Sequence, residues 1–286
     1  MTAAQLEHAT KHFGETAAVV DASFAVEEGE VVALLGPNGA GKTTSIALLL
    51  GLRRPDGGSA RLFGRDPRRA ETRRLVGATP QELMFPLTLR VTEVVELVRA
   101  HYPHPAPLAE VLDRFALGSL ARRQTGGLSG GERRRLAVAL AFAGGAPLAV
   151  LDEPTAGLDT GARRAVWDAV REQGRGGGAV LLTTHHLDEA EALASRVVVI
   201  ERGRIVADGS VAAIKAAAGL TRIRFRAPPT ATLGGPLQRD GDHLLLLARD
   251  AGAAVAQLVR DGVPLVDLEV RPVTLEEALD AMRGGP

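Results

Sequence analysis

The residues best suited to chemistry begin with a glycine-rich run between an apolar stretch, 31–35, and a helix-patterned stretch, 42–50. This strand, loop and helix context is what the phosphate-loop pattern G-x-x-x-x-G-K-[ST] requires. Glycines let backbone N–H groups approach phosphate oxygens, a lysine neutralises the β and γ phosphates, and a hydroxyl can bind Mg²⁺. We therefore predict a nucleotide site with Mg²⁺, formed by Gly36, Pro37, Asn38, Gly39, Ala40, Gly41, Lys42, Thr43 and Thr44.

The composition makes two of these residues stand out. Only three of the 34 basic residues are lysine, so Lys42 is a departure from a strong arginine bias. A compact ammonium suits a phosphate better there than a planar guanidinium. Asn38 is the only asparagine, which leaves none for the N-K-x-D guanine motif and disfavours a GTPase.

Two acids, Asp152 and Glu153, follow the apolar stretch 148–151. Parallel strands place ligand-binding groups at their carboxyl ends, and neighbouring strand residues point in opposite directions. We assign Asp152 to Mg²⁺ and Glu153 to the attacking water. In isolation such a pair is usually the start of a surface loop, and the upstream phosphate loop is what favours the functional interpretation.

A second glycine-rich segment, Leu128-Ser129-Gly130-Gly131-Glu132, contains another phosphate-binding helix start. Ser129 can cap a helix, while Gly130 and Gly131 leave N–H groups uncovered. Alone, the segment would be an ordinary capped helix. A single ATP has no evident use for two such starts in one chain.

Residues 128–132 resemble the signature sequence of ABC ATPases, and residues 152–159 (DEPTAGLD) resemble their extended Walker B motif and D-loop. The resemblance covers about residues 2–215. It implies ATP hydrolysis by a head-to-tail homodimer or pseudo-dimer, in which Ser129, Gly130 and Gly131 cover the γ-phosphate of the partner's ATP. Asp159 belongs to the same nucleotide-binding set.

Three further positions match the family's motifs. Gln81 resembles the Q-loop glutamine, which touches Mg²⁺ and the attacking water, and Phe13 occupies the place of the aromatic ring that stacks on adenine. His185 resembles the switch histidine, which contacts the γ-phosphate. His186 follows it directly, so an exchange of roles between the two histidines stays open, and we assign His185 because it comes immediately after Thr-Thr. The implied catalytic set is Glu153, His185, Gln81 and Lys42, and the Mg²⁺ set is Thr43, Gln81 and Asp152.

Strand patterns at 148–151 and 179–183 are separated by a helix pattern at 162–172, which indicates a parallel sheet covered on both faces. A strand pair at 197–200 and 204–207 closes this region. The resemblance implies an α/β fold: a P-loop NTPase core of ABC ATPase type with an N-terminal antiparallel β subdomain and a helical subdomain at about 83–145. Short strands are expected near 17–20 and 23–26. We place the nucleotide-binding domain at 1–219 and a small α+β appendage at 220–286.

The composition excludes several classes of partner. With 34 basic and 34 acidic residues, the chain has no bulk charge for nucleic acid, and without cysteine it has neither disulfides nor a thiolate metal site. We found no apolar leader in the first thirty residues and no uninterrupted apolar run of about 18 residues. We expect a cytoplasmic protein that reaches the inner face of the cell membrane only through a permease.

Residues 274–279 (TLEEAL) resemble the end of drug-resistance-type ATPases that work with separately encoded ABC-2 permeases, which implies an exporter. The apolar segment Leu83–Leu87 fits either contact with the permease or burial in the core. A soluble ABC ATPase is the alternative function, but the chain has neither two ATPase domains nor a long coiled coil. In that subgroup the contacts with the transported substrate belong to the permease.

Overall fold

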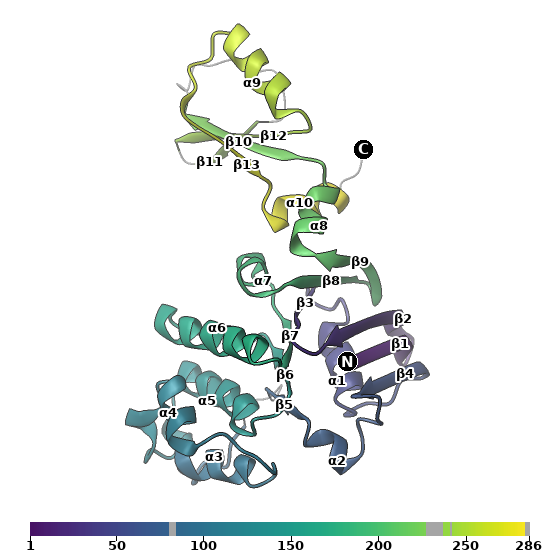
Figure 1. The fold of residues 1–286 in the computed structure, drawn as a ribbon, viewed down its shortest axis with the longest axis vertical. Helices are drawn as coiled ribbons and strands as arrows, with labels where there is room; N and C mark the ends of the chain where they lie inside the picture. The colour runs from purple at the N-terminus through teal and green to yellow at the C-terminus, as the bar shows by residue number, and fades with distance from the viewer. Residues whose placement is uncertain (80–83, 227–236, 241, 284–286) are drawn as a thin grey trace. The chain divides into compact units, whose positions relative to one another are not determined.

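The structure is a computed structural model that describes residues 1–79, 84–226, 237–240 and 242–283 (Figure 1). Its contacts divide the chain into two compact units, Met1–Asp208 and Gly209–Pro286. The sequence placed the boundary after residue 219. The prediction that residues 1–219 form the nucleotide-binding domain and residues 220–286 an appendage stays a prediction.

A six-stranded sheet forms the centre of the first unit, in the order β5-β6-β7-β3-β8-β9. The pairs β5/β6, β6/β7, β7/β3 and β3/β8 are parallel. All residues of β3 and β7 are buried, which explains their continuous apolar sequence. The strands are β3 (Val31–Leu35), β5 (Val76–Ala78), β6 (Leu148–Asp152), β7 (Ala179–Thr183), β8 (Arg196–Glu201) and β9 (Arg204–Ser210).

An antiparallel sheet, β2-β1-β4, packs in the same unit, and α1 (Lys42–Leu49) lies between the two sheets (Figure 1). Its strands are β1 (Thr2–Phe13), β2 (Thr16–Glu27) and β4 (Gly57–Leu62). The two short strands expected near 17–20 and 23–26 are one strand. Asp21, with φ 52°, and a shift in the register with β1 interrupt the pairing between them.

Helices dominate the chain between β5 and β6, as expected. The elements are α3 (Val91–Arg99), α4 (Leu108–Arg114), the short 3₁₀ turns η1 (Gly118–Leu120) and η2 (Thr125–Gly127), and α5 (Gly130–Ala143), with the short α2 (Ala70–Arg73) before β5. The second half of α5 is buried, and β6 follows it after a short turn. Helices α6 (Thr160–Arg175) and α7 (Leu187–Leu193) connect the later strands of the sheet.

The second unit has its own α+β core, which agrees with the expected appendage. Its sheet has the order β11-β12-β10-β13, from β10 (Thr221–Arg226), β11 (Leu237–Asp240), β12 (His243–Ala248) and β13 (Val266–Pro272). Ile223 and Phe225 pack with Leu258 of α9 (Ala251–Arg260) in its core. The remaining helices are α8 (Val211–Ala217) and α10 (Leu275–Arg283). Across the described ranges, no helix has the length and apolar character needed to cross a bilayer.

Candidate functional site

The glycine-rich loop joins β3 to α1, as the sequence predicted. A Cβ on Gly36 would lie 2.2 Å from the backbone oxygen of Ile200 in β8, and one on Gly41 would lie 2.4 Å from that of Ala18 in β2. Gly41 also has φ 109°, a conformation that side chains strongly disfavour. Glycine is therefore required at both positions to bring the loop close to its two neighbouring strands.

Lys42 is the first residue of α1, and its side chain is nearly buried, with 6% exposed. The ammonium donates hydrogen bonds to the backbone oxygens of Gly36 at 2.6 Å and Pro37 at 3.1 Å. No carboxylate in the described part of the chain forms an ion pair with it. A buried charge is costly unless it is paired, so this loop is suited to an anion such as a phosphate.

Three strand ends and the start of α1 bring oxygen atoms together around Asp152. Its carboxylate accepts hydrogen bonds from Thr43 Oγ1 at 3.1 Å and Thr183 Oγ1 at 2.5 Å. Its backbone N–H donates to Thr79 Oγ1 at 2.8 Å. A hydroxyl and a carboxylate beside a phosphate loop fit Mg²⁺, which prefers oxygen ligands and keeps several waters.

Glu153 and His185 lie side by side at the ends of β6 and β7. Glu153 Oε1 is 3.3 Å from His185 Nδ1. The Glu153 N–H donates to both oxygens of Thr183, at 3.0 Å to Oγ1 and 3.2 Å to the carbonyl. These bonds hold Glu153 at φ 46°, an unfavourable conformation for a side-chain-bearing residue and one that recurs at functional sites.

The ring of His186 lies next to that of His185, with centroids 4.1 Å apart and the ring planes tilted by 39°. Its backbone N–H donates to Thr184 Oγ1 at 2.9 Å, and it precedes α7. Among the described carboxylates, only Glu153 forms an ion pair with either of these two histidines, and its partner is His185. This contact supports the choice of His185 over His186, and the assignment itself stays a prediction.

Phe13 ends β1 with 45% of its surface exposed. Two cations flank the ring: Lys11 Nζ lies 5.9 Å and Arg53 Cζ 5.7 Å from its centroid. Lys11 is held by Asp56 at 2.7 Å, and that hydrogen bond is the main reason the pKa of Asp56 is lowered. An exposed aromatic face on a fixed strand end is available for stacking against a base.

Ser129 caps α5 through a reciprocal pair of hydrogen bonds with Glu132. The Glu132 N–H donates to Ser129 Oγ at 3.2 Å, and the Ser129 N–H donates to Glu132 Oε2 at 2.6 Å. The second bond is the largest cause of a lowered Glu132 pKa. A Cβ on Gly130 would meet nothing within 4 Å, so the helix start is uncovered on that side.

The D-loop consists of residues 154–159, which follow the two Walker B acids and lie between β6 and α6. Asp159 Oδ1 accepts a hydrogen bond from the Ala162 N–H at 2.8 Å and so caps α6. A Cβ on Gly131 would be 3.4 Å from the backbone oxygen of Gly157, which places the D-loop beside the start of α5.

The structure thus assembles some of the expected residues and keeps others apart. The phosphate loop, Asp152, Glu153 and His185 meet at the carboxyl ends of adjacent parallel strands. Within the ranges that the structure describes, no hydrogen bond or ion pair joins residues 128–132 to the phosphate loop or to Asp152. Gln81 lies outside the described residues.

Sequence reasoning did not assign Thr79 and Thr183, the two hydroxyls that hold the backbone and carboxylate of Asp152. Both lie at or just after the carboxyl ends of β5 and β7, which flank β6. Polar residues at those positions were the signal that could have identified them.

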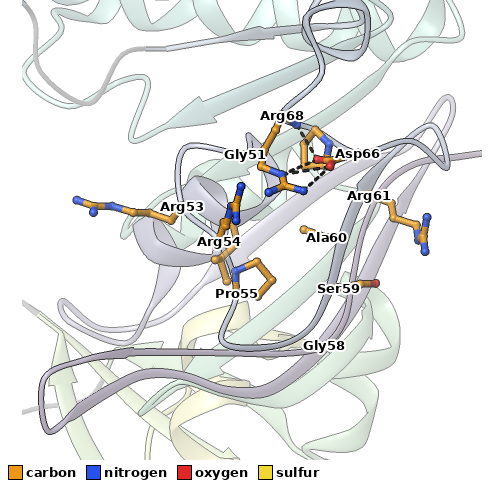
Figure 2. A pocket seen from close by; sticks show the side chains of 12 residues that line it. Gly51, Arg53, Arg54, Pro55, Gly58, Ser59, Ala60, Arg61, Asp66 and Arg68 are labelled. Atoms are coloured by element: carbon orange, nitrogen blue, oxygen red, sulfur yellow. Dashed lines mark hydrogen bonds and ion pairs between the residues drawn. The ribbon is translucent and has the colours of Figure 1, made fainter.

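A cavity of about 310 Å³ lies elsewhere in the first unit, next to the residues that follow α1 (Figure 2). Arg54 and Arg61 line it together with an ion pair between Arg68 and Asp66, whose charged atoms are 2.6 Å apart. Figure 2 shows Arg53 pointing away from this ion pair. None of the predicted nucleotide-binding residues lines the cavity, so we do not assign the nucleotide to it.

Comparison with known proteins agrees with the motifs. The sequence profile of the family described as ABC transporter matches residues 19–156. The chain is 36% identical to the daunorubicin/doxorubicin resistance ATP-binding protein DrrA of Streptomyces peucetius, over 96% of this chain and 91% of that protein. It is 40% identical to the Nod factor export ATP-binding protein I of Burkholderia lata, over 82% and 79% of the two chains.

Solved structures agree on the fold. One described as the ATP-binding subunit of an ABC transporter has a TM-score of 0.71 and 29% identity, covering 76% of this chain and 94% of that one. A dimeric ABC cassette in a post-hydrolysis state, bound to ADP and Pi, has a TM-score of 0.66 at 24% identity, covering 72% and 98%. At that identity the likeness supports the fold alone.

Proposed function

Because the chain belongs to the family of ABC transporter ATP-binding proteins, we propose that it drives an exporter whose permease is a separate polypeptide. Within that family it is an ATP-binding and ATP-hydrolysing subunit. The names of the relatives, one for drug resistance and one for export of Nod factor, support the direction of transport. The observation that carries the proposal is the cluster of Lys42, Asp152, Glu153 and His185 at one edge of the sheet.

Binding of ATP in this proposal uses the whole loop from Gly36 to Thr44, with Phe13 stacked on the adenine. The Lys42 ammonium exchanges its bonds to two backbone oxygens for phosphate oxygens. Thr43, Asp152 and Gln81 are the proposed Mg²⁺ ligands. The ion, when bound, neutralises charge on the β and γ phosphates.

Hydrolysis in this proposal relies on Glu153 as the residue that orients and polarises water for in-line attack on the γ-phosphorus. Its carboxylate is oriented by the two bonds from its N–H to Thr183. His185, in contact with that carboxylate, and Lys42 stabilise the charge that develops on the transferred phosphoryl group. The leaving group is ADP and the water supplies the new P–O bond.

The second helix start completes the site from another chain. Ser129, Gly130 and Gly131 make no bond to their own phosphate loop within the described residues, and their N–H groups at the start of α5 suit a γ-phosphate. A head-to-tail pair of chains brings each such start to the partner's ATP and forms two composite sites. Asp159 lies at the D-loop between them.

Coupling to the permease is proposed for Gln81 and the segment 83–87. Of that segment, Met84 is 79% and Leu87 is 65% exposed, which favours a contact surface over burial in the core. Leu83 falls outside the described residues. This contact would hold the chain at the inner face of the cell membrane. The proposal includes no nucleic acid partner, because basic and acidic residues are equal in number.

Glu153→Gln tests the proposal because it keeps the size of the side chain and removes the charge that polarises water. We expect turnover to be lost and an ATP-dependent dimer to accumulate on gel filtration. Asp168→Asn on α6 is the matched control, and it should leave both properties unchanged. Normal turnover, or a monomer in excess ATP, would show that Glu153 and the composite site are assigned wrongly.

A further inference from the structure

Glu189 is a buried carboxylate that none of the motifs accounts for. It is 1% exposed and lies in the first turn of α7, four residues after His185. Each oxygen accepts one hydrogen bond: Oε1 from Trp167 Nε1 at 3.0 Å, and Oε2 from Thr155 Oγ1 at 3.1 Å. Three separate segments therefore meet at this one side chain.

Burial of the Glu189 carboxylate costs folding free energy, because its charge is removed from water. No lysine or arginine in the described parts of the chain forms an ion pair with it, so two neutral donors and the N-terminal end of α7 stabilise its charge. An apolar residue of similar size would fill the same space without that cost. The cost is explained if the two hydrogen bonds serve a purpose beyond stability.

The backbone of Glu189 is hydrogen-bonded to residues 184–186, the segment that carries His185. Its N–H donates to the backbone oxygen of His186 at 3.2 Å, and the His186 N–H is held by Thr184 Oγ1 at 2.9 Å. The start of α7 and the loop that carries His185 are thus one hydrogen-bonded piece. His185 and Glu189 therefore belong to one hydrogen-bonded segment of the chain.

The side chain of Glu189 connects that piece to the D-loop. Thr155 is 2% exposed and lies two residues after Glu153. Its backbone oxygen accepts the Leu158 N–H at 3.1 Å, so Thr155 shapes the turn that contains Gly157. The oxygen of Gly157, in turn, lies beside Gly131 at the start of α5.

We propose that Glu189 is a positioning residue that links His185 to the D-loop and, through the D-loop, to the start of α5 in the same chain. The inference rests on the proposed function. In the dimer, His185 serves the ATP of its own chain, while Ser129 and its neighbours serve the ATP of the partner. Glu189 therefore connects the two ATP sites, so the state of one is transmitted to the other.

Two pairs of variants test the link. Thr155→Val removes the hydroxyl at constant size, whereas Thr155→Ser keeps it. Glu189→Met removes both acceptors, whereas Glu189→Gln keeps one acceptor for Trp167 and can bond to the Thr155 hydroxyl through its amide. We expect the first of each pair to lower kcat about tenfold and to reduce the Hill coefficient for ATP, with KM changed less than about twofold. Thr155→Ser and Glu189→Gln should retain most of the kcat and the cooperativity.

Trp167 gives a readout that does not depend on turnover, because it is the only tryptophan in the chain. ATP should change its fluorescence in the wild type and in Glu189→Gln, and the change should be lost in Glu189→Met, which cannot accept the hydrogen bond from Trp167 Nε1. The double variant Thr155→Val/Glu189→Met should be no worse in kcat than either single variant, since one link can be broken only once.

A purely structural role has a different outcome: Thr155→Val and Glu189→Met lower the melting temperature while kcat, cooperativity and the ATP response of Trp167 stay normal. That result overturns the inference, as do additive effects in the double variant. The failure is distinguishable from failure of the proposed function. If Glu153→Gln forms its ATP-dependent dimer, the composite site stands and only the role of Glu189 is wrong.

Discussion

Two variants that damage different halves of the composite site should restore activity when they are mixed. Lys42→Ala removes the ammonium that faces the phosphates, and Ser129→Ala removes the hydroxyl at the start of α5. If each chain contributes one half to each site, a dimer of one variant with the other has one fully damaged site and one intact site. Each variant alone has no intact site.

The magnitude follows from this arrangement. Random exchange of chains makes about half of the dimers mixed, and one of the two sites in each is intact, so the mixture should regain at most about a quarter of wild-type turnover. Coupling between the two sites lowers this value, because the damaged site then slows the intact one. Ser129→Ala also removes the 3.2 Å capping bond of α5. That loss costs about 1 kcal/mol, which lowers the melting temperature of a unit of this size by about 2–4 °C.

The assay measures phosphate release by each variant and by their equimolar mixture after exchange of subunits without nucleotide. Ser210→Ala is the matched control, because Ser210 caps α8 with a bond of 3.0 Å to the Ala213 N–H and has no proposed part in catalysis. It should lose a similar amount of stability and keep full turnover. A mixture no more active than its components would refute the reasoning that each chain supplies half of each site.

Three further predictions concern single positions. Phe13→Ala should weaken ATP binding about tenfold in fluorescence titration, the effect of losing one base stack, while Phe13→Tyr should not. Gly36→Ala should lower the melting temperature, because its Cβ would lie 2.2 Å from the oxygen of Ile200, and a wild-type thermal transition would contradict this. The folded pKa of Glu132 lies below its unfolded value, so its charge stabilises the fold above the ordinary carboxyl range and this contribution is lost as pH falls through the folded pKa. The difference in urea stability between wild type and Glu132→Gln should therefore shrink in acid, and a constant difference would contradict the role of its bond to Ser129.

The parts of the fold with strong local signals could be predicted from the sequence. The apolar run of β3, the glycine loop and the helix after it are adjacent in the chain, so their arrangement needed no tertiary information. The third strand of the antiparallel sheet, β4, was not predicted. Its pairing with β1, for example Gln5 opposite Arg61, joins residues far apart in the chain and leaves little periodicity to detect.

The same limit applies to the site. Asp152 and Glu153 were found because two acids follow an apolar strand downstream of a phosphate loop, and glycine patterns identified both helix starts. The roles of Thr79 and Thr183 arise from the register of neighbouring parallel strands, in which Asp152 stands opposite Thr183. A threonine carries no charge and is common in strands, so its place at a strand end is a weaker signal than the two carboxylates after β6.

The strained backbone at Glu153 has a consequence for engineering. A positive φ costs about 1 kcal/mol or more for any residue with a Cβ, and glycine avoids this cost. Glu153→Gly should therefore yield a protein that melts at a higher temperature and hydrolyses no ATP. A library screened for thermal stability alone would be enriched in this dead variant, so selection must include turnover or keep position 153 fixed.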